Sequence, residues 1–350
     1  MADFITPFED FGFVPHEKGL EPTRRRVDTI VTSELIEDLK RRLFSSKKRT
    51  RLAAAWEIRQ IKDKRILPLL KKALFSEEDP HILSEIVSAF LYYPEKEAIL
   101  ELSRFAFQVK EIDLRKKVIW VLSHFHSSKE ALDTLHTLSL TDPEPSVRKE
   151  AVFALGEIAN PDRIGTLREV LLTDENADVR KMAIWAIGEL KEGGVDLVIN
   201  SLKEDDSKEV RREAAWVLGK KRLESALSSL IDGLKTETDQ KVIEVILWAI
   251  AQISPKSLSK IEFLFSDNFD ERVKAEYLWL LGRCKIKKVL KKIIKKYLGS
   301  SKIVKRAMIW ALTQIGGRIA FSNLRRWYKL EKDKDLKEKI MWAIGRLGKR

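Results

Sequence analysis

Apolar and polar residues alternate along most of this chain with the period of an amphipathic helix. In Val179–Leu190, small or apolar residues occupy positions 1, 5, 8, 9 and 12, a spacing of about 3.6 residues. A second amphipathic segment precedes it at Arg163–Leu172, and a polar turn rich in Asp and Asn, Thr173–Asp178, joins the two. The pattern predicts a unit of helix A, turn and helix B.

This unit repeats, and tryptophan marks the repeat most clearly. Eight of the nine tryptophans fall on position 7 of helix B, and only Trp327 does not. Copies of helix B begin at Thr50, Ile82, Leu114, Val147, Val179, Val210, Val242, Val273, Val304 and Leu336. One unit cannot bury its apolar face alone, whereas stacked units can. The length of 350 residues is therefore explained by ten copies of one unit, without a second globular core.

The repeat resembles a known family. An Asp-rich turn followed by Val-Arg-x-x-Ala-x-x-Ala-Leu-Gly, as in Val147–Gly156, is similar to the HEAT-like repeat of the phycobilisome-lyase (PBS lyase) type. The resemblance covers residues 33–350 and implies an all-α, right-handed α-solenoid of about ten HEAT-like helix pairs. In such solenoids helix B lines the concave surface and helix A the convex one. Residues 1–32 lack the repeat and form an N-terminal arm that carries Phe4, Phe8, Phe11 and Phe13; we expect it to cap the first repeat or to act as a linear motif.

The aromatic position 7 is the first candidate site. With 100° per residue, Val179, Ala183 and Ile187 define the buried face of their helix, and Trp185 lies well away from its centre. The aromatic residues either anchor a partner in the concave groove or cover the neighbouring helix B, and the pattern leaves both readings open. The candidate partner-binding residues are Trp56, Trp120, Phe153, Trp185, Trp216, Trp248, Trp279, Trp310 and Trp342.

An arginine recurs at position 2 of helix B, as Arg51, Arg115, Arg148, Arg180 and Arg211. It follows the acidic turn of each repeat. In HEAT-type repeats this arginine bonds a turn aspartate, so the resemblance implies a structural ladder of charge pairs rather than a ligand site.

Charge is distributed unevenly and defines the second candidate site. The net charge is +13, but residues 271–350 hold 24 basic and 6 acidic residues, and residues 277–330 hold no acid. Lys285–Leu298 is expected to be a helix A that docks by Ile286, Val289 and Ile293 and exposes its lysines. Such a surface attracts an anionic partner or is a solvated end of the chain. The candidate anion-binding residues are Lys287, Lys288, Lys291, Lys292, Lys295, Lys296, Arg325 and Arg326.

Catalytic chemistry has little support in the sequence. His124 and His126 are two residues apart and face different sides of their segment, and no metal-ligand spacing accompanies them. Cys284, the one cysteine, falls on a predicted buried position. Gly193-Gly194 and Gly316-Gly317 are interpreted as turns between helices. We therefore expect no catalytic residues, no metal and no cofactor.

These observations favour a non-catalytic scaffold or adaptor. It would bind another protein along the aromatic stripe and an acidic partner through the basic C-terminal third. The alternatives are a protein that binds nucleic acid without reading its sequence and, less favoured, a bilin-lyase-like or assembly-chaperone subunit. No signal peptide and no transmembrane span are recognisable, so we expect a cytoplasmic location.

Overall fold

The computed structural model describes residues 31–266 and 269–348, with the side chains of Leu290 and Lys291 excepted. Those residues contain nineteen α-helices and no strand. The predicted N-terminal arm lies outside them, apart from its last two residues. The chain divides into two compact units, Met1–Gly194 and Val195–Arg350, each of which is described separately.

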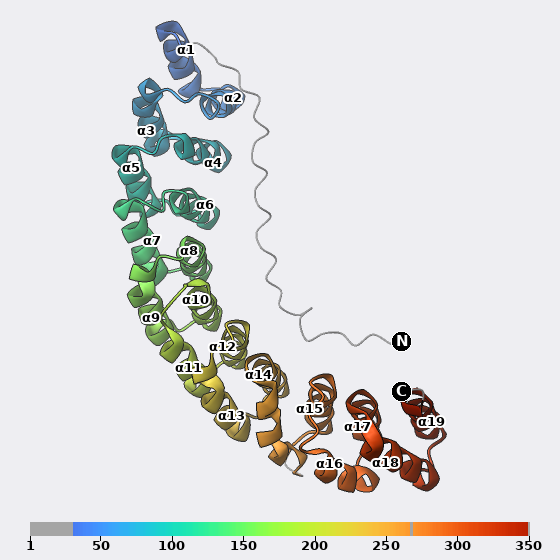
Figure 1. Cartoon of the computed structure of the whole chain (residues 1–350). Coiled ribbons are helices and arrows are strands. Elements are labelled where there is room, and N and C mark those ends of the chain that lie inside the picture. Colours follow the sequence, from blue (N-terminus) through green and yellow to red (C-terminus); the bar gives the residue numbers. More distant parts are fainter. Residues whose placement is uncertain (1–30, 267–268, 349–350) are drawn as a thin grey trace. The chain divides into compact units, whose positions relative to one another are not determined.

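Unit 1 consists of five helix pairs (Figure 1). Within a pair the two helices pack together, and each helix B also packs on the helix B of the next pair. The pairs, helix A first, are α1 (Ser33–Leu43) with α2 (Lys48–Ile58), α3 (Leu67–Ser76) with α4 (Pro80–Ala89), α5 (Lys96–Ala106) with α6 (Ile112–Ser123), α7 (Lys129–Thr141) with α8 (Pro145–Ile158), and α9 (Ile164–Thr173) with α10 (Ala177–Glu189).

Unit 2 also consists of five pairs, but one of them lacks an α-helical first member. Two 3₁₀ segments, Pro255–Lys260 and Glu262–Phe265, stand in the place of helix A before α15 (Glu271–Arg283). The other pairs are α11 (Val195–Glu204) with α12 (Lys208–Lys220), α13 (Leu227–Thr236) with α14 (Gln240–Ile253), α16 (Leu290–Lys296) with α17 (Lys302–Ile315), and α18 (Gly317–Leu330) with α19 (Lys334–Gly348).

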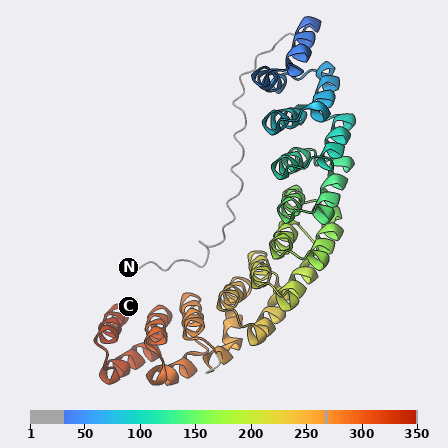
Figure 2. The same ribbon diagram turned by 180° about the vertical axis from the view of Figure 1, so that it is seen from behind.

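Each unit therefore has two layers, which the views from opposite sides separate clearly (Figures 1 and 2). The first helices form an A-helix layer and the second helices a B-helix layer. The predicted all-α solenoid of ten helix pairs is confirmed, with the one irregular first member as a refinement.

Polar turns fix where the B helices begin. Asp79, Asn176 and Asp239 precede α4, α10 and α14, and each side chain accepts hydrogen bonds from backbone N–H groups of the first helical turn. These groups have no partner inside the helix, so an Asp or Asn at this position satisfies them. The predicted buried face of α10 is also confirmed, because Val179, Ala183, Ala186, Ile187 and Leu190 are at most 1% exposed.

The predicted helix over Lys285–Leu298 is wrong at its N-terminal end. Residues 285–289 are turn and irregular chain, α16 begins only at Leu290, and Tyr297–Gly299 continues it as a 3₁₀ turn. Lys285 has φ 54° where the chain leaves α15. Lys287 and Lys288 would occupy the first turn of a longer helix, where the helix dipole disfavours cations. The apolar anchoring is as expected, since Val289 and Ile293 are buried.

Candidate aromatic and basic interaction surfaces

The nine aromatic residues at position 7 all lie on B helices, and we call them the aromatic row. In unit 1 they are Trp56 (α2), Trp120 (α6), Phe153 (α8) and Trp185 (α10), and in unit 2 Trp216 (α12), Trp248 (α14), Trp279 (α15), Trp310 (α17) and Trp342 (α19). None of them is fully buried. They differ, however, in how much of each ring the neighbouring helix covers.

Glycine in the preceding B helix lets several of these rings pack closely. A Cβ atom added at Gly156 would lie 2.6 Å from the Trp185 ring, and one at Gly219 would lie 2.6 Å from the Trp248 ring. Gly282 stands in the same relation to Trp310. These glycines occupy position 10 of the repeat. The sequence shows that glycine recurs at this position. The structure shows that the tryptophan ring of the next B helix packs against it.

Ring contacts connect members of the row as well. Phe153 and Trp185 stack with 5.1 Å between ring centroids and 23° between ring planes. Trp279 and Trp310 are 3.8 Å apart and inclined by 42°. Such contacts stabilise the stacking of neighbouring pairs. These rings therefore contribute to packing between neighbouring B helices, and part of each ring remains accessible to solvent.

Three tryptophans are considerably more exposed. Trp56 is 56% exposed, Trp120 36% and Trp342 57%. Position 10 of the preceding B helix is Leu91 before Trp120 and Thr313 before Trp342, so neither ring has a glycine to lie against. A cation lies over each of these two rings, Lys117 at 4.2 Å from the Trp120 ring and Arg346 at 5.3 Å from the Trp342 ring.

The arginines at position 2 form the predicted ladder, with one refinement. Arg148 donates from Nε to Asp174 at 2.7 Å and from Nη1 to the Asp142 carbonyl at 2.8 Å. Arg148 therefore binds the turn before its own helix through the Asp142 carbonyl oxygen and the turn of the next repeat through the Asp174 carboxylate. Arg51 with Glu77, Arg115 with Asp142 and Arg211 with Glu237 repeat the arrangement, so the acid is Glu in some repeats and Asp in others.

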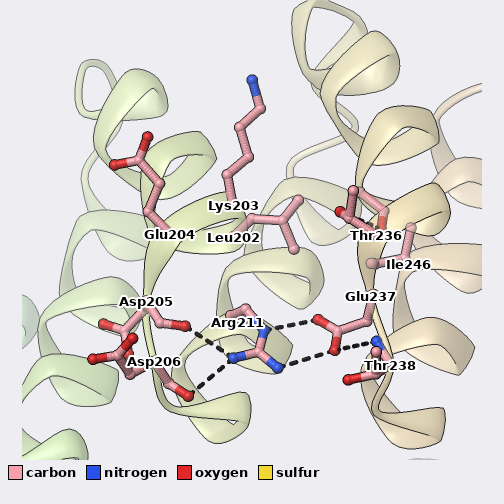
Figure 3. A pocket seen from close by; sticks show the side chains of 11 residues that line it. Leu202, Lys203, Glu204, Asp205, Asp206, Arg211, Thr236, Glu237, Thr238 and Ile246 are labelled. Carbon is pink, nitrogen blue, oxygen red and sulfur yellow. Dashed lines mark hydrogen bonds and ion pairs between the residues drawn. The ribbon is translucent and has the colours of Figure 1, made fainter.

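Two pockets lie at this ladder. One of about 320 Å³ in unit 2 surrounds Arg211, whose guanidinium reaches Glu237 on one side and the Asp205 and Asp206 carbonyls on the other (Figure 3). A second, of about 270 Å³, surrounds Arg51 and Glu77 in unit 1. Because the same hollow recurs around the same structural pair, we interpret both as products of the repeat and not as built ligand sites.

The predicted anion-binding residues lie on the A-helix layer of the last two pairs. Lys287, Lys288, Lys292, Lys295, Lys296, Arg325 and Arg326 are exposed, and the side chain of Lys291 lies outside the described part of the chain. Three of them have contacts within the protein, and one of these is Arg325, whose guanidinium lies 5.8 Å from the centroid of the Phe321 ring. Lys292 pairs with Glu262, and Lys296 donates to the Phe265 carbonyl at 2.7 Å.

Two histidine rings lie within hydrogen-bond distance of groups of the fold itself. The Nδ1 atom of His124 lies 2.8 Å from the Trp120 carbonyl oxygen, and that of His136 lies 2.8 Å from Thr166 Oγ1. Burial raises the pKa of the half-buried Cys284 thiol, which disfavours a reactive thiolate. No group of three or more His, Cys, Asp or Glu residues in the described ranges is placed to hold a metal ion.

Among the described helices, none combines the length and the apolar character that crossing a membrane requires. The two glycine pairs have the positive φ values expected of turns, from 70° to 87°.

Comparison with known proteins supports the fold. Residues 99–174 and 164–251 match a model of HEAT repeats, and residues 50–76 match a model of the PBS lyase HEAT-like repeat. The chain has no match among curated proteins.

Solved structures of similar fold include long solenoids. A structure of Kap95p with RanGDP shares 12% identity over 90% of this chain and 51% of its own, with a TM-score of 0.54. Kap121p bound to the extreme C-terminus of the phosphatase Cdc14p shares 14% over 90% and 46%, with a TM-score of 0.53. This chain spans about half the length of these relatives. The chain therefore carries HEAT repeats over residues 99–251 and a repeat of the PBS lyase HEAT-like type over residues 50–76.

Proposed function

We propose that this protein is a scaffold or adaptor that binds another protein along the B-helix layer, with the aromatic row as its anchor points. One observation carries the proposal. Aromatic side chains occupy the same position on nine of the ten B helices, all except α4, which has Ser88 there, and each keeps part of its ring accessible. Aromatic residues are enriched among the residues that dominate binding energy at protein interfaces.

The fold supports this reading. Stacked helix pairs present an extended surface on which one chemical feature recurs at regular intervals. Kap95p and Kap121p, which share the fold, are described in complexes with protein partners. Their identity with this chain is too low to transfer any particular partner, so the partner here is defined only as a protein with apolar side chains at its contact surface.

The differences in exposure indicate which tryptophans to test. Trp185 and Trp248 lie against glycines of the neighbouring helix, and replacing them would disturb stacking as well as binding. Trp56, Trp120 and Trp342 are the most exposed members of the row. Changing these three to Ala removes contact area with the least effect on the fold.

The experiment is a pull-down with mass spectrometry, carried out with and without nuclease, followed by affinity measurement with the purified partner. We expect the W56A/W120A/W342A protein to keep its melting temperature and to bind at least about thirtyfold more weakly, since loss of one hot-spot residue costs about 2 kcal/mol or more. A control, W327A, removes a buried tryptophan outside the row and is expected to lower stability first. Unchanged affinity in the triple variant would refute the proposal.

A further inference from the structure

A strongly basic surface covers the A-helix layer of the last two pairs, and we call it the basic face. It comprises the turn before α16, α16 itself, the 3₁₀ turn Tyr297–Gly299 and α18 (Figure 1). Its exposed cations are Lys287, Lys288, Lys292, Lys295, Lys296, Arg318, Arg325, Arg326 and Lys329. It lies within unit 2 and is separate from the aromatic row.

The cations of α18 form one line along the solvent side of the helix. Arg318, Arg325 and Lys329 are spaced at i, i+7 and i+11, which places them on one face of an α-helix. The opposite side is buried through Ala320, Leu324 and Trp327. Docking of the apolar side therefore directs this line of cations outward.

The two basic segments are held together through their inner faces. The buried rings of Tyr297 and Trp327 stack with 3.8 Å between centroids and 10° between planes. The Tyr297 hydroxyl donates to Glu331 Oε2 at 2.9 Å. This contact fixes the end of α16 beside α18, so that their cations belong to one continuous surface.

Ion pairing divides the cations of this region into two classes. On the B helix α17, Lys302, Lys305 and Arg306 pair with Asp333, Glu331 and Asp335. On the basic face, no carboxylate of the described residues is in ion-pair contact with Lys287, Lys288, Lys295, Arg318, Arg325, Arg326 or Lys329. The cations of α17 are therefore paired with carboxylates, whereas on the basic face only Lys292 has such a partner among the described residues.

Exposed aliphatic side chains accompany these cations. Leu298 is 60% exposed beside Lys295 and Lys296, Ile319 is 49% exposed beside Arg318, and Leu330 is 47% exposed beside Lys329. The surface thus offers both charge and exposed apolar side chains.

We propose that the basic face binds the surface of an anionic phospholipid bilayer. Clusters of four to eight Lys and Arg residues are attracted to anionic headgroups, and aliphatic side chains among them enter the boundary between headgroups and acyl chains. A nucleic-acid backbone would neutralise the cations equally well, but it offers nothing for Leu298 and Ile319 to bury against. The aliphatic residues therefore favour the bilayer over a phosphate polymer.

The test is co-sedimentation of the full chain with vesicles of phosphatidylcholine alone and of phosphatidylcholine with 30% phosphatidylserine. We expect binding to the anionic vesicles only, decreasing as salt rises. Each basic residue near the surface contributes about fivefold to partitioning. The R318Q/R325Q/K329Q variant should therefore bind about a hundredfold more weakly. The matched control K110Q/K129Q/K203Q, which removes three exposed cations elsewhere, should bind like the unmodified chain.

A second variant separates the bilayer from other anions. L298S/I319S keeps every charge and should weaken vesicle binding severalfold, while affinity for single-stranded poly-U RNA stays unchanged. Equal vesicle binding by this variant, or no binding of the unmodified chain to anionic vesicles, would overturn the proposal. Melting temperatures confirm that the variants are folded. The aromatic-row variant W56A/W120A/W342A retains the basic face and should bind vesicles normally, so this test is independent of the proposed scaffold function.

Discussion

At the scale of single residues, glycine at position 10 determines how close two neighbouring B helices can approach. The space that a side chain would fill at Gly219 is taken by the Trp248 ring and by the backbone of Ala249, whose Cα would lie 2.8 Å from an added Cβ. An indole can shift slightly, but a helix backbone cannot move without disturbing its own hydrogen bonds. The Trp248 ring therefore packs in this place only because residue 219 is glycine.

We predict that Gly219→Ala destabilises the protein by about 1–3 kcal/mol, the usual cost of overpacking, although alanine is the better helix former. Gly165→Ala is the matched control, because Gly165 lies in α9 and has no atom within 4 Å of the added Cβ. Gly165→Ala should leave the stability of the protein unchanged or raise it slightly, because alanine is the better helix former. Thermal unfolding of both variants measures the difference, and a stabilised Gly219→Ala protein would contradict the packing role.

At the scale of elements, sequence periodicity predicted the helices that have strong local signals. The repeated pattern with its 3.6-residue spacing identified every B helix, because the buried stripe of a helix is encoded by residues close together in the sequence. The irregular segment before α15 was not anticipated. Pro255–Lys260 and Glu262–Phe265 are 3₁₀ turns whose apolar residues Leu258, Ile261 and Leu264 are buried much as those of a helix would be, so periodicity alone does not distinguish them.

The sites were predictable to different degrees. The aromatic residues at position 7 were found from the repeat alone. Their location on the B helices follows from the helical pattern of the same repeat. The close packing of Trp185, Trp248 and Trp310 depends on the glycine at position 10 of the preceding repeat, which lies about 30 residues away in the sequence. Likewise, Lys302 and Lys295 look equivalent in the sequence, but only Lys302 faces the acidic turn at Asp333. In both cases the contact is made with a residue of a neighbouring repeat, which the local sequence does not reveal.

The carboxylates of the ladder make stability depend on pH. Burial alone would raise the pKa of Glu237, but hydrogen bonds from Arg211 and from the backbone N–H groups of Asp239 and Thr238 outweigh it and hold the pKa below its ordinary value. Glu77, which Arg51 contacts, has a lowered pKa for the same combination of causes. A glutamate in the unfolded chain has a pKa of about 4.3, so the unfolded state binds more protons when the pH falls below that value.

We therefore predict that the free energy of unfolding is nearly constant above about pH 5 and falls as the pH drops through 4 and below. Glu237→Gln should lower stability at pH 7 by about 1–3 kcal/mol and should make the acid dependence shallower. Glu175→Gln, at an exposed turn position, is the control and should change neither. Urea unfolding at a series of pH values measures both effects, and an unaltered acid dependence in Glu237→Gln would show that other groups control it.

At the scale of the whole molecule, the net charge of +13 is the balance of two unlike regions. Residues 271–350 carry the entire excess, and residues 1–270 hold 42 basic and 47 acidic residues. Many cations elsewhere are paired locally, as Arg41 is with Asp38 at 2.5 Å on α1. Self-repulsion is consequently concentrated on the basic face, where it opposes folding of the last two pairs.

Salt should relieve this repulsion more than it weakens the ladder. Repulsion between exposed cations is screened over a Debye length of about 10 Å at 0.1 M salt, whereas the ladder pairs are largely buried and screened much less. We predict that raising NaCl from 0.05 to 0.5 M increases the melting temperature. The increase should be smaller in R318Q/R325Q/K329Q, because part of the repulsion has already been removed, and unchanged in K110Q/K129Q/K203Q. A melting temperature that decreases with salt would show that attraction within the ion pairs outweighs repulsion on the basic face. The basic face would then destabilise the protein only slightly.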